Sequence, residues 1–279
     1  MTNEQYTTKI TPTWCPGCGN FGILAALIQA LTQLELSPQQ VAIVTDVGCS
    51  GNMADFVNTG VLHALHGRAL PPAAGIKLAN HDLKVIAIIG DGGCYGEGMT
   101  HLISLMRGNH DITAIIHNNG LYSLTTGQAA PTTPKGQITK STPEGVIEEP
   151  INPLTLALSN QATFIARGYS MNVPHFTELL VQAIKHAGFS FIDALQPCVT
   201  FNKKLLAEQE KKIQVLAQKP KTKQEAWQLA EQTDQLGIGI FWQEQRPAYH
   251  QEVATLKQQS LIKQPIDKIN IAELLKEFI

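Results

Sequence analysis

Two short segments of the sequence combine residue types that can hold a phosphate group and a metal ion. The sequence GDGG at 90–93 begins at the last residue of the apolar run 85–90, and NN at 118–119 begins at the last residue of the apolar run 113–118. Glycines let a backbone approach a phosphate closely, while Asp carboxylate and Asn carbonyl oxygens suit Mg²⁺. Ligands bind at the carboxyl ends of strands in parallel sheets. The pairing therefore favours a magnesium–diphosphate site over two ordinary turns.

Four of the five cysteines form a second candidate site. Cys15 and Cys18 make a C-x2-C pair, and Cys49 and Cys198 both follow predicted strands, where they could converge with that pair. Four thiolates suit either a [4Fe–4S] cluster or tetrahedral zinc, and their irregular spacing does not separate the two. The alternatives are buried small residues and, for the C-x2-C pair, a redox dithiol. Cys94 is predicted to be a packed small residue without a chemical role.

The elements that must position these residues alternate along the chain. Apolar runs of strand length lie at 41–46, 85–90, 113–118, 163–168 and 189–195, and helical spacing is found at 21–36, 98–108, 153–160 and 175–188. Continuous apolar runs indicate strands that are covered on both faces. We therefore predict an α/β fold with a mainly parallel sheet flanked by helices over residues 1–200. The segment 118–150 is unusually long for a loop, which favours a functional role.

The sequence changes character at residue 201, where it becomes charged and rich in Gln. The segment 203–232 is predicted to form two helices broken at Pro220, followed by a strand at 236–242 and a helix at 271–279. We interpret residues 201–279 as a C-terminal helical extension that packs on the core or on a partner subunit.

Composition limits the function further. The chain has 279 residues with 21 basic and 23 acidic side chains, which gives no broad positive field of the kind that a nucleic-acid-binding protein needs. No stretch has the length of a membrane span, and the N-terminus lacks the apolar segment of a secretory signal. We therefore expect a cytoplasmic protein, in which cysteines seldom form disulfides and metal or redox chemistry is favoured.

The paired GDGG and NN segments are similar to the fingerprint of thiamine-diphosphate enzymes, and longer stretches are similar to one family of them. The stretches WCPGCGNFGILAAL, GCSG, LHGRALPPAAGIKLAN, GDGGCYGEG, NNGLYSLTTGQAAPTTPKG and QPCVTFN occur in the order seen in β subunits of 2-oxoacid:ferredoxin oxidoreductases. The resemblance covers residues 12–205. The segment 238–253 also resembles the tail of the two-subunit members, such as 2-oxoglutarate:ferredoxin oxidoreductase, whose β chain pairs with a larger α subunit.

This resemblance implies a thiamine-diphosphate-binding fold and a set of site residues. The Mg²⁺ ligands would be Asp91, the Asn119 side chain and the Leu121 backbone carbonyl. The residues that contact thiamine diphosphate would be Gly90, Asp91, Gly92, Gly93, Asn119, Leu121 and Tyr122. The [4Fe–4S] ligands would be Cys15, Cys18, Cys49 and Cys198. A cluster also suits the chemistry better than zinc, because it can accept one at a time the two electrons released from a 2-oxoacid.

The reaction implied by the family is oxidative decarboxylation of a 2-oxoacid, in the presence of CoA, to acyl-CoA and CO₂, with electrons passing to ferredoxin. Activation of the cofactor would depend on the α subunit, so we expect this chain alone to be inactive. His66 and Arg68 are candidates for contact with the diphosphate or a substrate carboxylate, although they could instead bond backbone carbonyls. Glu97 is predicted to be a solvated residue or a cap for the following helix.

Two positions give conflicting indications about the substrate. Members that act on 2-oxoglutarate or on many 2-oxoacids often carry Lys or Arg where this chain has Asn52, whereas Leu124 stands where strict pyruvate enzymes tend to have Asn. We expect 2-oxoglutarate or a broad range that includes pyruvate. The alternatives are an arylpyruvate:ferredoxin oxidoreductase, a non-oxidative thiamine-dependent decarboxylase and, from another class, a zinc-stapled nucleotide-binding scaffold subunit.

Overall fold

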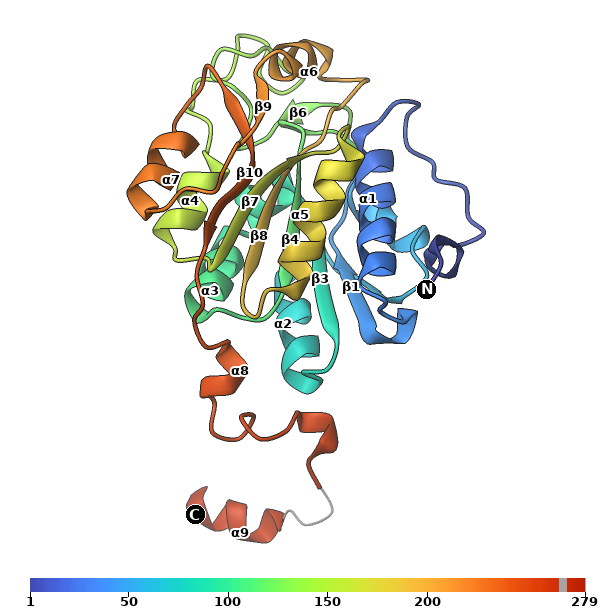
Figure 1. Ribbon diagram of the computed structural model, residues 1–279, viewed down its shortest axis with the longest axis vertical. Helices are drawn as coiled ribbons and strands as arrows, with labels where there is room; N and C mark the ends of the chain where they lie inside the picture. Colours follow the sequence, from blue (N-terminus) through green and yellow to red (C-terminus); the bar gives the residue numbers. More distant parts are fainter. Residues whose placement is uncertain (266–269, 279) are drawn as a thin grey trace.

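An eight-stranded sheet forms the centre of the computed structural model, which describes residues 1–265 and 270–278 (Figure 1). Its strands are β1 (Val41–Thr45), β2 (Gly60–His63), β3 (Lys84–Gly90), β4 (Thr113–Asn118), β7 (Phe164–Tyr169), β8 (Ser190–Leu195), β9 (Ile213–Val215) and β10 (Leu236–Gln243). They lie in the order β2-β1-β3-β4-β8-β7-β10-β9, and all neighbours are parallel except β7 and β10. The mainly parallel α/β fold is confirmed.

Helices cover both faces of this sheet because its inner strands are apolar on both sides. One face carries α1 (Gly19–Gln33) and α5 (Val173–Lys185), and the other carries α2 (Leu70–Ala79), α3 (Met99–Gly108), α4 (Pro153–Ser159) and α7 (Lys223–Ala230). A hydrophobic core lies on each face of the sheet, and alternate residues of β3 pack into one or the other. Ile86 and Ile88 pack towards α1 and α5, whereas Ala87 packs into the core on the opposite face. The sheet is thus buried on both faces, as the continuous apolar runs predicted.

The predicted helices and strands up to residue 200 are found with ends shifted by up to three residues, but α2 and β2 were not predicted, and the predicted loop 118–150 contains a short antiparallel pair, β5 (Leu121–Tyr122) and β6 (Gln128–Ala129). Helix α2 begins with Leu70-Pro71-Pro72, and prolines argue against a helix unless they occupy its first turn, where the missing N–H groups have no helical partner anyway. Strand β2 is exposed along its whole length at the edge of the sheet, so its sequence shows no apolar run.

The chain beyond residue 200 combines helices with strands. Helix α6 (Lys203–Glu210) is shorter than the first helix predicted there, because residues 213–215 turn into β9 beside β10. Helix α7 follows Pro220 as predicted, and the strand predicted at 236–242 is β10. Since β10 pairs with β7, this part of the chain extends the central sheet. The division into domains at residue 200 stays a prediction.

The C-terminal segment leads away from the sheet through α8 (Tyr249–Glu252) to α9 (Ile271–Leu275) (Figure 1). A 3₁₀ turn at Lys276–Phe278 continues α9, and Ile279, the last residue of the predicted helix, lies outside the described residues. Among the helices that the structure describes, none has both the length and the apolar character needed to cross a membrane.

Candidate cofactor and cluster site

Two adjoining cavities lie where β1, β3, β4 and β8 end. The first, of about 170 Å³, is lined by Asn52, Leu124 and all four predicted cluster ligands, Cys15, Cys18, Cys49 and Cys198. The second, of about 310 Å³, is lined by the predicted cofactor residues Gly90, Asp91, Gly92, Gly93, Asn119, Leu121 and Tyr122, together with His66 and Glu97. Cys49, Asn119, Ser123 and Leu124 line both. The two cavities that contain the predicted site residues therefore share a common wall, which consists of these four residues.

Asp91 supplies a buried carboxylate at the end of β3. Its Oδ2 accepts a hydrogen bond from the Gly120 N–H at 2.8 Å and another from the Thr132 hydroxyl. Burial raises the pKa of Asp91 to about 6, and these hydrogen bonds oppose the shift. Asp91, Asn119 and Leu121 together offer carboxylate, amide and peptide oxygens around one cavity, which is a donor set that fits Mg²⁺.

The GDGG segment is glycine-rich because neighbouring groups occupy the space that side chains would need. An ideal Cβ on Gly92 would lie 2.4 Å from the Tyr122 ring, and one on Gly93 would lie 2.2 Å from the Asp46 carboxylate. Gly93 opens a short π-helical turn, Gly93–Glu97, that leads from β3 into α3. The backbone is thereby held open along the cavity, where a diphosphate could approach it.

Replacing Gly93 by Ala should therefore destabilise the protein by about 2 kcal/mol, since the new methyl group overlaps a buried carboxylate. Gly75→Ala is the matched control, because a Cβ at Gly75 in α2 meets no atom within 4 Å and should stabilise the helix by about 0.5–1 kcal/mol. Urea unfolding of both variants measures the difference. Equal effects of the two substitutions would show that the space around Gly93 is not restrictive.

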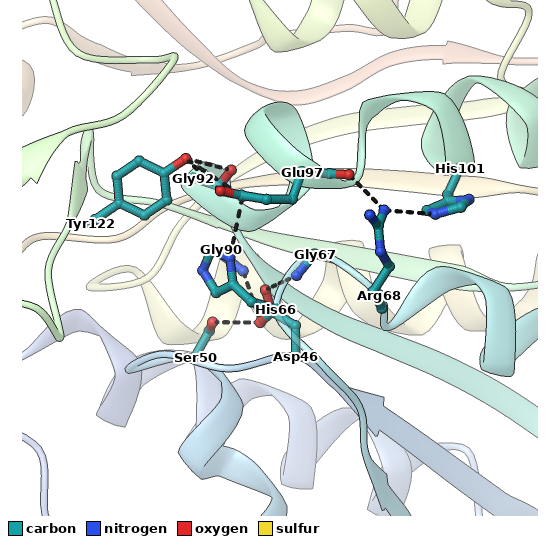
Figure 2. A network of polar contacts seen from close by, with 10 residues as sticks. All are labelled: Asp46, Ser50, His66, Gly67, Arg68, Gly90, Gly92, Glu97, His101 and Tyr122. Carbon is teal, nitrogen blue, oxygen red and sulfur yellow. Dashed lines mark hydrogen bonds and ion pairs between the residues drawn. The ribbon is translucent and has the colours of Figure 1, made fainter.

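A polar network connects His66, Glu97 and Tyr122 beside the cofactor cavity (Figure 2). The His66 Nδ1 lies 3.2 Å from a Glu97 carboxylate oxygen, and the Tyr122 hydroxyl donates to Glu97 at 3.4 Å and to the Gly92 carbonyl at 3.3 Å. The pKa of Tyr122 is raised to about 12, mainly because the hydroxyl is buried and secondly because the Glu97 carboxylate lies nearby. Glu97 thus pairs with two neighbouring side chains and makes no capping bond to α3.

Arg68 contributes to this network from outside the cavity. Its guanidinium donates to the Glu97 backbone carbonyl at 2.7 Å and lies 2.8 Å from the His101 Nε2 (Figure 2). In the part of the chain that the structure describes, Arg68 lines neither cavity. Of the two basic candidates, His66 is therefore placed to meet a ligand, and Arg68 is placed to hold the turn that carries Glu97.

Asp46 lies beside the GDGG segment, supports the cofactor cavity from behind and was not predicted from the sequence. It follows β1 and is fully buried, and its carboxylate accepts long hydrogen bonds of 3.4 Å from the Gly67 and Gly90 N–H groups and from the Ser50 hydroxyl (Figure 2). Burial raises its pKa to about 7. An Asp at the end of an apolar run is visible in the sequence, but Asp46 lacks the adjoining glycines and the paired NN segment that singled out Asp91.

This buried carboxyl should make the stability of the cofactor-free chain fall with pH. The unfolded chain releases the Asp46 proton near pH 3.8 and the folded chain near pH 7, so stability declines as the pH rises between these values, by at most about 1.4 kcal/mol per unit. Asp46→Asn should remove this contribution, so the slope of stability against pH between pH 6 and 7.5 should be more positive in the variant than in the wild type; buried histidines with lowered pKa values, such as His110 and His117, add a rise with pH that both proteins share. Unfolding in urea at several pH values measures this slope.

Asp82→Asn provides the control, because Lys263 lowers the pKa of that exposed carboxyl and it titrates well below this window. Parallel pH profiles for the wild type and Asp46→Asn would contradict the assignment.

The four predicted cluster cysteines surround their cavity from three parts of the chain. The Cys49 backbone carbonyl accepts hydrogen bonds from the Trp14 indole at 2.7 Å and from the Asn20 side chain at 3.2 Å. Because Trp14 and Asn20 flank the C-x2-C pair in the sequence, these bonds hold the Cys49 backbone close to that pair. Burial raises the pKa values of Cys18 and Cys49 to about 11, and the neighbouring thiols add to both shifts. A cationic group in the cavity would reverse these shifts.

The four predicted cluster cysteines line one cavity. Four thiols around one space are a ligand set that fits a [4Fe–4S] cluster, and they also suit tetrahedral zinc. Among the described residues, no three Cys, His, Asp or Glu side chains are grouped closely enough to hold a single metal ion without rearrangement.

Comparison with known proteins shows the class to which the chain belongs. The family described as "Thiamine pyrophosphate enzyme, C-terminal TPP binding domain" matches residues 46–194, and the family of the C-terminal part of the pyruvate ferredoxin oxidoreductase β chain matches residues 198–258. The 2-oxoacid:ferredoxin oxidoreductase β subunit of Saccharolobus solfataricus is 53% identical over 68% of this chain, and that of a Sulfolobus species is 42% identical over 86%. The chain belongs to the β-subunit family of the 2-oxoacid:ferredoxin oxidoreductases.

The extent of these matches differs between relatives. The alignments cover 63% of the Saccharolobus protein, which is less than two thirds of its length, and 85% of the Sulfolobus protein. A solved structure of 2-oxoglutarate:ferredoxin oxidoreductase from Magnetococcus marinus, with 2-oxoglutarate, coenzyme A and succinyl-CoA bound, is similar with a TM-score of 0.92 and 29% identity. That match covers 99% of this chain and 96% of the other.

Proposed function

We propose that this chain is the β subunit of an enzyme that oxidises 2-oxoacids to acyl-CoA and CO₂ and passes the electrons to ferredoxin. It would hold thiamine diphosphate through Mg²⁺ and carry a [4Fe–4S] cluster. The observation that carries the proposal is the common wall of the two cavities, formed by Cys49, Asn119, Ser123 and Leu124. A cofactor that releases electrons and a group that accepts them would be separated there by single side chains.

In this proposal, one group of residues binds the cofactor and its metal ion, and another group binds the cluster that accepts electrons. Asp91, Asn119 and Leu121 would hold Mg²⁺, and the open backbone of the GDGG segment would receive the diphosphate. When bound, thiamine diphosphate supplies the site that accepts the electron pair released as CO₂ leaves. His66, held by Glu97, would meet the diphosphate or the substrate, and the four cysteines would bind the cluster.

The enzyme would work only as a complex, in which an α subunit activates the cofactor. The test is anaerobic purification of this chain with its α subunit, followed by analysis of iron, sulfide and thiamine diphosphate. One cluster and one cofactor per β chain are expected, and the separated β chain should reduce no viologen. A colourless complex that contains stoichiometric zinc would overturn the proposal.

Substrate choice within this proposal is 2-oxoglutarate or a broad range that includes pyruvate. Asn52 lines the cluster cavity and Leu124 lines both cavities, so both residues are placed to influence what enters. Viologen reduction by the complex with pyruvate, 2-oxoglutarate, branched-chain and aryl 2-oxoacids distinguishes the possibilities. Activity confined to aryl substrates, or decarboxylation without an electron acceptor, would contradict this choice. We further propose that the complex acts in the cytoplasm with ferredoxin as its partner.

A further inference from the structure

Gln196 is a buried side chain that contacts both candidate sites. It directly follows β8, and only 2% of its surface is exposed. Its Oε1 accepts a hydrogen bond from the Asn119 side-chain amide at 2.9 Å, and its Nε2 lies 3.3 Å from the Cys18 Sγ. One carboxamide thus joins a predicted magnesium ligand to a predicted cluster ligand that lies far away in the sequence.

The neighbours of Gln196 fix the orientation of its carboxamide. The Pro197 backbone carbonyl, 2.8 Å from the Nε2, can only accept a hydrogen bond. The Oδ1 of Asn119 already accepts from the Leu121 N–H at 3.1 Å and from the Ser123 hydroxyl at 2.8 Å, so its amino group faces Gln196. A flipped carboxamide would oppose two acceptors at Pro197 and two donors at Asn119. The contact with Cys18 is therefore an N–H···S hydrogen bond.

We propose that Gln196 is a positioning residue that couples the magnesium–diphosphate site to the cluster, an inference that rests on the proposed function. By accepting from the amide nitrogen of Asn119, it fixes the orientation of that carboxamide, whose oxygen faces Leu121 and Ser123 on the wall of the cofactor cavity. By donating to Cys18, it stabilises negative charge on that sulfur, which favours the reduced cluster over the oxidised one. A single side chain thus tunes both the binding of the metal and the ease with which the cluster accepts an electron.

The two hydrogen bonds can be separated by substitution in the complete complex. Gln196→Met has a similar volume and loses both bonds, so the Mg²⁺ concentration for half-maximal cofactor binding should rise about tenfold. Its cluster should also become harder to reduce, with the reduction equilibrium shifted about threefold or more. Gln196→Glu keeps an acceptor oxygen for Asn119 and removes the amide donor to Cys18. It also turns a carboxylate oxygen towards the Pro197 carbonyl and the Cys18 sulfur, so its negative charge adds to the effect of the lost hydrogen bond on the cluster. It should therefore bind Mg²⁺ within about threefold of the wild type and still have a lowered cluster potential.

The measurements are thiamine diphosphate binding against Mg²⁺ concentration and a redox titration of the cluster followed by electron paramagnetic resonance. Gln29→Met is the matched control, because Gln29 in α1 accepts a 3.2 Å hydrogen bond from Thr177 in α5, away from both sites. Both quantities should keep wild-type values in this control. Wild-type values in Gln196→Met, or equal changes in the control, would overturn the coupling. A wild-type complex without a cluster or cofactor would instead overturn the proposed function itself.

Discussion

Replacement of Asp91 by Ala is expected to lower 2-oxoacid-dependent viologen reduction by at least about a hundredfold, since loss of even an outer partner of a metal ligand costs 10–100-fold. The carboxylate lies at the end of β3 on the wall of the cofactor cavity, and Asn119 and Leu121 supply only neutral oxygens there. Thiamine diphosphate should therefore be lost from the purified complex. Cofactor analysis and turnover measure the two effects separately.

The fold should survive this substitution, because Asp91 is a buried carboxyl whose pKa is raised and which has no cationic partner among the described residues. At pH 8 the cofactor-free variant should be no less stable than the wild type. Thr132→Val is a graded control: it removes only the hydroxyl that donates to Asp91, so a loss of about tenfold is expected. Full cofactor content in Asp91→Ala would contradict the magnesium site.

Replacement of Cys49 by Ala should remove the iron–sulfur cluster and lower ferredoxin reduction by at least about a hundredfold, because clusters are held by thiolates. Among the four predicted cluster ligands, Cys49 is the one that lines both cavities, so its loss breaks the contact between electron donor and acceptor as well as the cluster. Iron and sulfide analysis of the anaerobically purified complex measures the first effect, and reduction of ferredoxin measures the second.

Cys94→Ala is the corresponding control. Cys94 is buried in the hydrophobic core that packs against α2 and α3, away from the cluster cavity, so iron should be retained. The expected cost is about 1 kcal/mol of stability from the lost packing. If Cys49→Ala kept its iron and its paramagnetic signal, the assignment of the four ligands would be wrong.

Residues that lie within a few positions after apolar strands could be placed from the sequence. Asp91, Asn119 and Cys49 follow β3, β4 and β1, and parallel strands place their carboxyl ends at one edge. Cys198, three residues after β8, lies at the same edge. Strand ends thus indicated where the two sites lie, whereas the individual ligands were named from the resemblance to the 2-oxoacid:ferredoxin oxidoreductases, and the roles of those residues remain predictions.

The contacts that complete the site were not predictable, because they depend on side-chain packing between distant segments. Gln196 lies inside the recognisable stretch QPCVTFN, yet nothing in the spacing indicates that it reaches Cys18 and Asn119. Likewise the pairing of His66 with Glu97 depends on how the turn before α2 meets the turn before α3. Local sequence patterns specify strands and turns, whereas these contacts depend on the packed tertiary structure.

The common wall of the two cavities has a consequence for redesign of the enzyme. Leu124 is half exposed and lines both spaces, so a larger or charged residue there, introduced to change which 2-oxoacid is accepted, also changes the water and charge around the thiols. Substrate range and redox behaviour are then linked traits. Attempts to broaden the range through Leu124 should select compensating changes near the cysteines, whereas Asn52, which lines only the first cavity, does not touch the cofactor space.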